Sequence, residues 1–123
     1  MDIKRTETDP PLAIREWGWR FHHMGIPTSG PIKNERYLPH LKFYVGGFES
    51  SPFGIEWMRF EEDCPVNQLA QTFPHIAFEV DDLDLELQKH NFKIITKPNA
   101  PGEGVRVAML EHNGAPVELI EFN

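Results

Sequence analysis

The chain carries the same pair of chemically useful residues twice, once in each half. Residues 55–60 and 117–122 both place a glutamate second in a mainly apolar run that closes on phenylalanine. Upstream of each run, a histidine stands before another short apolar segment. The order is therefore His, Glu, His, Glu, formed by His23, Glu56, His75 and Glu118. Two imidazoles and two carboxylates suit a borderline divalent ion, namely Zn, Ni, Co, Fe or Mn, better than Ca or Mg.

The two glutamates interrupt strand faces that are otherwise apolar. Because side chains alternate between the two faces of a strand, Glu56 shares a face with Met58, and Glu118 shares one with Ile120. A lone carboxylate on such a face is costly unless it is paired or binds a cation. Glu121 falls on the opposite face from Glu118, where we expect water to solvate it.

The two histidines stand beside small residues on their strand faces. His75 shares a face with Ala77, and His23 shares one with Gly25. Such neighbours would leave open volume beside both imidazoles, as the wall of a cavity requires. His22 directly precedes His23, so we expect it to point to the other face, at the surface or supporting a ligand from behind.

Each of the four residues also has an ordinary structural explanation. A single histidine near a strand end is usually a satisfied polar residue, and a single glutamate in a strand is usually solvated. The repetition favours a site, because unrelated accidents would have to coincide in both halves. The four residues lie too far apart in the sequence for a local finger-type motif, so tertiary structure must bring them together.

The remaining candidates for chemistry are weaker. We expect His40, His90 and His112 to face solvent, because they fall in a predicted helix, a helix end and a turn. Cys64 is the only cysteine, has no activating partner visible in the sequence, and is interpreted as structural. No phosphate-binding loop or dinucleotide fingerprint is present.

Length and charge limit the classes of function. A chain of 123 residues is expected to form one domain. The formal charge is −7 without a compensating basic cluster, which argues against a nucleic-acid partner. No apolar run approaches the roughly 20 residues of a membrane span, and the chain starts without the apolar core of a signal peptide. Together with the single cysteine, these features lead us to expect a cytoplasmic protein without a membrane partner.

Hydrophobic patterning and turn residues predict a similar plan for both halves. A helix over residues 33–41 is predicted in the first half, and a helix over 83–89, capped by Asp81-Asp82, in the second. Residues 97–104 are predicted to be a loop and Asn113-Gly114 a hairpin turn. We expect strands at residues 21–26, 42–48, 53–60, 74–80, 92–96, 105–110 and 115–122.

These elements divide the single domain into two modules. We expect module one at about residues 14–64 and module two at about 73–123, with a short linker over 65–73. Residues 1–13 are polar and contain two adjacent prolines, so they are predicted to be a loose lead-in. In module one, the sequence leaves open whether residues 41–48 form one strand or two.

Two tryptophans, Trp17 and Trp19, lie between the lead-in and the first predicted strand. One interpretation is an extra edge strand over residues 14–20 that packs on the core of its own chain. The other is an arm that caps a partner subunit, since tryptophan is common at interfaces. The sequence does not separate these interpretations.

Three stretches resemble the vicinal oxygen chelate superfamily, which includes glyoxalase I, methylmalonyl-CoA epimerase, bleomycin and fosfomycin resistance proteins, and extradiol dioxygenases. They are residues 22–26, 74–83 and 113–121. Module two matches throughout, and module one matches at its two ends. The resemblance implies an α+β fold in which two βαβββ modules form an open, cup-shaped mixed sheet.

The resemblance also implies a site and a partner. A metal would lie at the floor of the cup, held by one residue from the first and last strand of each module. Carried onto this chain, those residues are the quartet found by the repeat: His23, Glu56, His75 and Glu118. Members are commonly dimers, so we expect a homodimer, with the tryptophan arm as one candidate for the contact.

The activity that the resemblance implies is that of a metal-dependent lyase or isomerase of glyoxalase type acting on a small-molecule substrate. Proton transfer next to a carbonyl would pass through a metal-stabilised enediolate, with Glu118 as the catalytic base and Glu56 as the second candidate. Glyoxalase I holds glutathione with basic residues, but Arg20, Arg36 and Arg59 form no recognisable glutathione motif.

Three alternatives stay open. A non-catalytic protein of the same fold could sequester a small molecule, as resistance proteins do. A dioxygenase is a further alternative, although extradiol dioxygenases typically use three protein ligands for iron, whereas this chain offers four candidates. A ferredoxin-like α+β domain without a metal would leave the paired histidines and glutamates unexplained.

Overall fold

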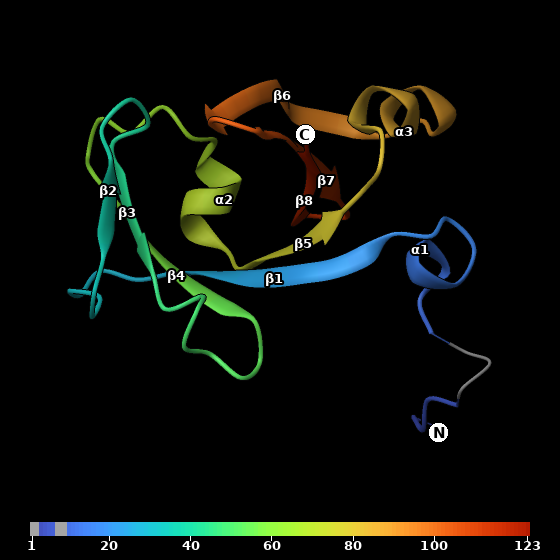
Figure 1. Ribbon diagram of the computed structural model, residues 1–123, viewed down its shortest axis with the longest axis horizontal. Helices are drawn as coiled ribbons and strands as arrows, with labels where there is room; N and C mark the ends of the chain where they lie inside the picture. Colours follow the sequence, from blue (N-terminus) through green and yellow to red (C-terminus); the bar gives the residue numbers. More distant parts are fainter. Residues whose placement is uncertain (1–2, 7–9) are drawn as a thin grey trace.

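The computed structural model describes residues 3–6 and 10–123, so residues 1–2 and 7–9 of the predicted lead-in lie outside the described residues. One mixed sheet of eight strands organises the described chain, in the order β2-β3-β4-β1-β5-β8-β7-β6 (Figure 1). The strands are β1 (Arg20–Pro27), β2 (Arg36–Leu38), β3 (Phe43–Gly46), β4 (Ile55–Phe60), β5 (His75–Glu79), β6 (Lys93–Gly102), β7 (Val105–His112) and β8 (Ala115–Phe122). The helices are α1 (Leu12–Arg15), α2 (Gln68–Thr72) and α3 (Leu83–Lys89).

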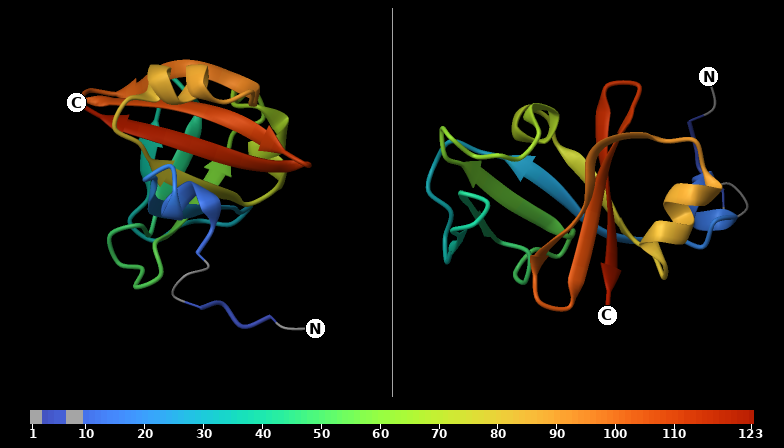
Figure 2. Two further views of the ribbon diagram at one scale, coloured as in Figure 1. Left: turned by 90° about the vertical axis from the view of Figure 1, so that its right-hand side faces the viewer. Right: turned by 90° about the horizontal axis from the view of Figure 1, so that it is seen from above.

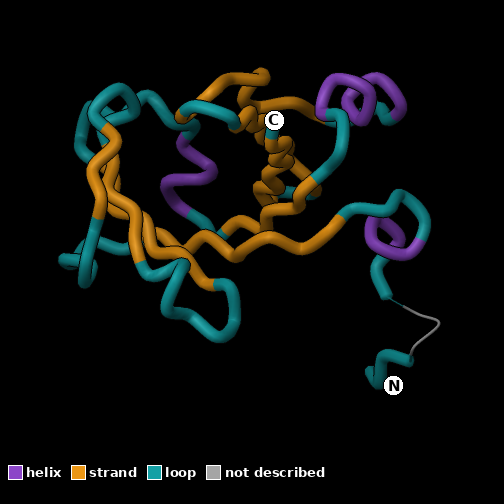
Figure 3. Tube along the Cα trace, in the orientation of Figure 1, coloured by secondary structure: helices purple, strands orange, loops and turns teal. Residues whose placement is uncertain are grey.

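The two halves of the chain meet edge to edge in the middle of this sheet. β1 pairs antiparallel with β5, while β4 lies parallel to β1 and β8 lies parallel to β5. The sheet curls around one side, with α2 inside the curl and α3 outside it (Figures 1 and 3). Seen from above, β6, β7 and β8 cross the direction of β1 and β4 (Figure 2). The predicted cup-shaped α+β fold is confirmed.

The helix predicted over residues 33–41 is wrong, and the short strand β2 occupies its middle. Asn34 takes a positive φ of 58°, a left-handed conformation that interrupts a helix. Arg36 and Leu38 then pair with β3, opposite Val45 and Phe43. Module one therefore has a loop and an edge strand where module two has a helix.

Module two follows its prediction closely. Asp82 caps α3, because its side chain accepts a hydrogen bond from the Leu85 backbone N–H. Glu121 does lie on the outer side of β8, but it is not left to water: its Oε1 accepts a hydrogen bond from the Leu83 backbone N–H at 2.9 Å. Asn113 and Gly114 both have positive φ, as the predicted hairpin turn requires.

β6 is longer than predicted and includes most of the residues assigned to a loop. Its pairing with β7 continues to Gly102, but the register shifts three times along the ladder. Pro98 and Pro101 offer no backbone N–H, which fits irregular pairing at an edge strand. This end of β6 borders the cavity described below.

The predicted edge strand over residues 14–20 is wrong, because α1 and a turn occupy most of it. Trp19 is 4% exposed and belongs to the core that α3 covers, together with Phe78 and Leu83. Trp17 packs against the same core, with its ring centroid 5.0 Å from that of Trp19. Both tryptophans thus pack inside their own chain.

No helix among the described residues is long and apolar enough to cross a bilayer.

Candidate metal centre

The four central strands each carry one residue of the predicted quartet. Glu56 on β4 and His75 on β5 both lie opposite Gly25 of β1. Ala77 of β5 lies between His23 on β1 and Glu118 on β8. Neighbouring strands therefore bring together residues that are distant in the sequence, all within one chain.

Three of the four residues converge closely enough to bind one ion. His23 Nε2 lies 3.3 Å from His75 Nε2 and 3.4 Å from Glu118 Oε1. His75 Nε2 lies 3.6 Å from the same Glu118 oxygen. Ligands about 2.1 Å from a tetrahedral ion stand roughly 3.4 Å apart, so these separations match a shared metal. Glu56 Oε1 is 3.7 Å from His23 Nε2, but Glu56 stands outside the group of three.

The protonation states of His23 and Glu118 also suit a metal ligand. Burial, with the neighbouring His75 and His22, lowers the pKa of His23 to about 4 despite the opposing charge of Glu118. His23 is therefore a neutral imidazole at pH 7. Burial alone would raise the pKa of Glu118, but the adjacent rings of His75, His23 and His22 hold that pKa below its usual value. A neutral imidazole and an ionised carboxylate are the forms that bind metals.

Glu56 differs from Glu118 in both position and charge. Burial, followed by the charge of Glu118, raises the pKa of Glu56 to about 7, while His75 and Arg36 oppose the increase. A carboxyl group with this pKa can accept or release a proton near neutral pH. Glu56 is thus suited to proton transfer beside the three-residue group.

A cavity of about 820 Å³ opens over these residues. His23, Glu56 and Glu118 line it at the central strands. Its wall is mainly apolar and comes from both modules and from α2; it includes Phe43, Val45, Met58, Met109, Ile120 and Ala70. The position of α2 was not predicted from the sequence, which had assigned these residues to a linker.

Solved structures of other proteins share this architecture at low sequence identity. No protein-family profile matches the chain, and no curated protein matches it. A hypothetical protein from Bacillus halodurans C-125 matches at TM-score 0.66 with 20% identity, covering 85% of this chain and 95% of that one. Methylmalonyl-CoA epimerase from Mycobacterium tuberculosis matches at TM-score 0.59 with 16% identity, covering 85% and 88%.

A third structure carries the superfamily in its description. It is a glyoxalase/bleomycin resistance protein/dioxygenase superfamily member from Vibrio splendidus 12B01. It matches at TM-score 0.51 with 12% identity over 85% of this chain and 99% of that chain. The chain has the fold of the vicinal oxygen chelate superfamily. The resemblance seen in the sequence is confirmed at the level of the fold.

In this vicinal oxygen chelate fold, the ring of His75 is positioned by packing. His75 is 1% exposed, and its Nδ1 forms no hydrogen bond within the described part of the chain. The imidazole lies against Gly25, where a Cβ atom would be only 2.0 Å from His75 Cε1. The predicted role of Gly25 as a small neighbour is therefore more specific: its missing side chain makes room for a candidate ligand of the adjacent strand.

Strand alternation predicted that His22 points to the face opposite His23, and this prediction is wrong. An extra residue in β1 shifts the register with β5 between Phe21 and His23, which indicates a β-bulge. His22 consequently lines the cavity beside His23. Its Nδ1 lies 2.8 Å from His23 Nδ1, so one ring donates a hydrogen bond to the other. His22 thus supports a candidate ligand from behind, which is one of the two roles predicted for it.

The remaining histidines and Cys64, which were not expected to belong to the site, lie mostly where the sequence predicted. His40 and His112 are exposed, and Cys64 is buried with its thiol donating to the Leu41 carbonyl oxygen. His90 is the exception, because it packs against Trp17 instead of facing solvent. None of these residues belongs to the group around Glu118.

Proposed function

We propose that the protein is a metal-dependent lyase or isomerase of glyoxalase type, which moves a proton on the carbon next to a carbonyl group. The observation that carries this proposal is the convergence of His23, His75 and Glu118 at the floor of an apolar cavity, with Glu56 beside them. Among the proteins of similar fold, one is described as an epimerase. That description supports proton-transfer chemistry on this scaffold.

Three residues would hold the ion and a fourth would move the proton. His23, His75 and Glu118 would be the ligands, and a divalent ion bound there supplies a Lewis acid for two neighbouring substrate oxygens. Glu56 would take the proton from the substrate carbon and return it, because it lies beside the ligands and titrates near pH 7. The resemblance in sequence predicts Glu118 as the catalytic base and Glu56 as the second candidate. In this proposal Glu56 is the base and Glu118 is a metal ligand.

The cavity contributes by binding the rest of the substrate. Its apolar wall would hold a small organic molecule and exclude water from the reacting atoms, which strengthens electrostatic interactions at the floor. Phe43, Met58 and Met109 belong to this wall. A substrate with an apolar portion next to its carbonyl group would fit such a wall.

Metal content tests the first half of the proposal. Wild type and His75→Ala would each be reloaded with Ni, Co, Zn, Fe and Mn, and analysed for elements. We expect about one ion per wild-type chain and little in the variant, because one of three ligands is missing. His112→Ala removes an exposed histidine and should bind metal like wild type. No metal under any loading would contradict the proposal.

Turnover tests the second half. The loaded protein would be screened with α-keto aldehydes and acyl thioesters for isomerisation. On any substrate that wild type converts, Glu56→Gln should lower kcat by about 10²–10⁴-fold with its metal retained. Glu118→Gln should lose both activity and metal affinity. Full turnover in Glu118→Gln would show that this carboxylate has no part in the reaction.

A second candidate function is suggested by the composition of the three-residue group. Two histidines and one carboxylate are the ligand set of many non-haem iron oxygenases. A fold neighbour is described as a member of a superfamily that includes dioxygenases. Loading with Fe(II) and measuring oxygen consumption with a catechol would distinguish this activity, because isomerisation consumes no oxygen.

A further inference from the structure

The cavity has a charged residue at some distance from the candidate metal ligands. Arg36 lines it from β2. The strand register places Arg36 opposite Val45 of β3, which in turn lies opposite Met58 of β4. All three residues line the cavity, so they form a row across its wall. Because neighbouring strands are about 4.8 Å apart, this row separates the backbones of Arg36 and Met58 by roughly 10 Å.

Among the described residues, Arg36 differs from four other arginines in that its side chain has no carboxylate partner. Arg15, Arg20, Arg59 and Arg106 each lie within 4.0 Å of an Asp or Glu oxygen. Within the part of the chain that the structure describes, the side chain of Arg36 forms no hydrogen bond or ion pair. Its guanidinium group is therefore available to a ligand without breaking an existing pair.

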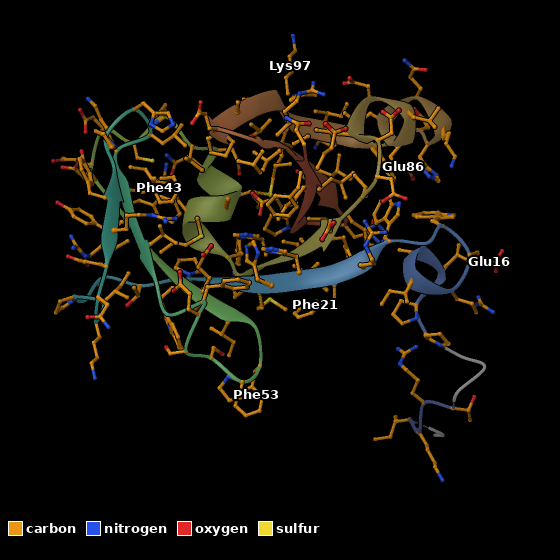
Figure 4. All side chains as sticks on the ribbon, viewed as in Figure 1. Glu16, Phe21, Phe43, Phe53, Glu86 and Lys97 are labelled. Carbon is orange, nitrogen blue, oxygen red and sulfur yellow. The ribbon has the colours of Figure 1, made fainter. Side chains whose placement is uncertain are left out.

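Arg36 lies on the cavity side of β2, because Leu38, two residues further along the strand and therefore on the same face, also lines the cavity. Lys97 also lines the cavity, but its side chain points outward from β6 (Figure 4). Arg36 is therefore better placed than Lys97 to meet an anion inside.

We infer that the substrate carries a carboxylate, bound by Arg36, which an apolar segment separates from the oxygens that react at the floor of the cavity. Val45 and Met58 would contact that segment. A single guanidinium group binds a carboxylate with two parallel hydrogen bonds, whereas a phosphate dianion generally needs more positive charge than Arg36 alone provides. The inference rests on the proposed function, because the position of the reacting oxygens is taken from it.

Paired hydroxamates provide the test, because a hydroxamate chelates a metal through two adjacent oxygens. The monohydroxamates of adipic and suberic acid carry a distal carboxylate, and hexano- and octanohydroxamate are the matching chains without it. Dissociation constants would be measured by calorimetry on cobalt-loaded protein. The carboxylate should improve wild-type affinity about tenfold for at least one chain length, since the pair is charge-assisted.

Variants decide whether Arg36 is responsible. In Arg36→Gln the carboxylate advantage should fall below about twofold, and Arg36→Lys should restore part of it. Lys97→Gln removes the same charge from the rim and should keep the full advantage. An advantage that survives Arg36→Gln, or that Lys97→Gln abolishes equally, would overturn the inference.

The same variants separate this inference from the proposed function. If the hydroxamates bound equally with and without cobalt, the metal-dependent function would fail. Arg36 would then be tested on the metal-free protein with octanoate and octanamide, which differ in the charge of the head group. Tighter binding of octanoate by wild type but not by Arg36→Gln would support carboxylate binding by Arg36. Equal binding of the two compounds by wild type would overturn it.

Discussion

Gly25 and His75 lie opposite each other on β1 and β5, and the imidazole of His75 occupies the space where a side chain at position 25 would begin. A Cβ atom at Gly25 would lie 2.0 Å from His75 Cε1 and 2.6 Å from both ring nitrogens. No contact that close is possible. The orientation of one candidate metal ligand therefore depends on the absence of a side chain on the adjacent strand.

Gly25→Ala should accordingly damage the metal site more than the fold. The added methyl group must displace the His75 ring, so we expect metal affinity to fall by at least about tenfold. Overpacking of this kind costs about 1–3 kcal/mol of unfolding free energy. Cobalt binding followed by visible absorption, with urea denaturation of the metal-free protein, would measure both effects.

Gly30→Ala is the matched control, because a Cβ atom at Gly30 would have no atom within 4 Å. It should bind cobalt as wild type does. If Gly25→Ala also bound cobalt normally, the His75 ring would have to be free to move, and its position in the structure would not be the metal-binding one.

His22 should influence metal binding although it is not in the three-residue group. Its Nδ1 lies 2.8 Å from His23 Nδ1, and this bond leaves His23 Nε2 directed toward His75 and Glu118. In His22→Phe the ring stacking with Phe48 could persist, but the hydrogen bond is lost. We expect about a tenfold loss of cobalt affinity, typical of removing a partner behind a ligand. His40→Phe alters an exposed histidine and should have no effect.

Acid should remove the stabilisation that the Glu86 carboxylate gives to the folded protein, and one substitution at Glu86 can measure this contribution. Burial by itself would raise the pKa of Glu86, but a hydrogen bond from Trp19 Nε1 at 2.7 Å, together with Lys89 and His90, holds that pKa below 4.5. A pKa lowered by folding stabilises the protein above the unfolded value of 4.5, and the benefit disappears as the pH falls through the folded value.

Glu86→Gln should therefore be less stable than wild type at pH 7, by about 1 kcal/mol. The difference should shrink as the pH falls from 4.5 through the lower pKa of the folded protein, because Glu86 becomes protonated over this range, first in the unfolded and then in the folded chain. Urea midpoints of both proteins between pH 3 and pH 7 would show this. A difference that stayed constant with pH would mean that the charge of Glu86 does not contribute.

The oligomeric state remains a proposal, and we propose a homodimer. Because both tryptophans pack in the core of their own chain, we place the contact on another surface. Phe21 is 47% and Phe53 75% exposed, and Figure 4 shows both below β1, on the side opposite α2. Light scattering at micromolar concentration should give twice the mass of one chain. Phe21→Ser combined with Phe53→Ser should reduce it to one; a monomeric wild type would contradict the proposal.

Most of the strands and the positions of the metal-binding candidates could be predicted, because they depend on local alternation. His75 falls on the face of Ala77, and Glu118 on that of Ile120, as expected for side chains of period two. Distance in the sequence did not matter, because the repeat identified which strands correspond. The same rule failed at His22, where one inserted residue changed the alternation and left no sign in the sequence.

Features that depend on the partner strand could not be predicted in this way. Residues 33–41 read as a helix by composition, yet β2 forms there because β3 offers an unpaired edge. Likewise, Arg36 can only be recognised as unpaired once the partners of Arg59 and the other arginines are known. Secondary-structure propensity describes a segment alone. The formation of β2 and the lack of a partner for Arg36 depend on the neighbouring strands and side chains.

The antiparallel pairing of β1 with β5 is the seam between the halves of the chain, and it has a thermodynamic consequence. Each half supplies ligands to the candidate centre, so an ion could be held fully only when both halves are folded and aligned. Its binding free energy would then be added to the association of the halves. If the chain were cut within residues 65–73, the two fragments should reassemble more tightly as metal is added, so that the ion acts as a removable crosslink.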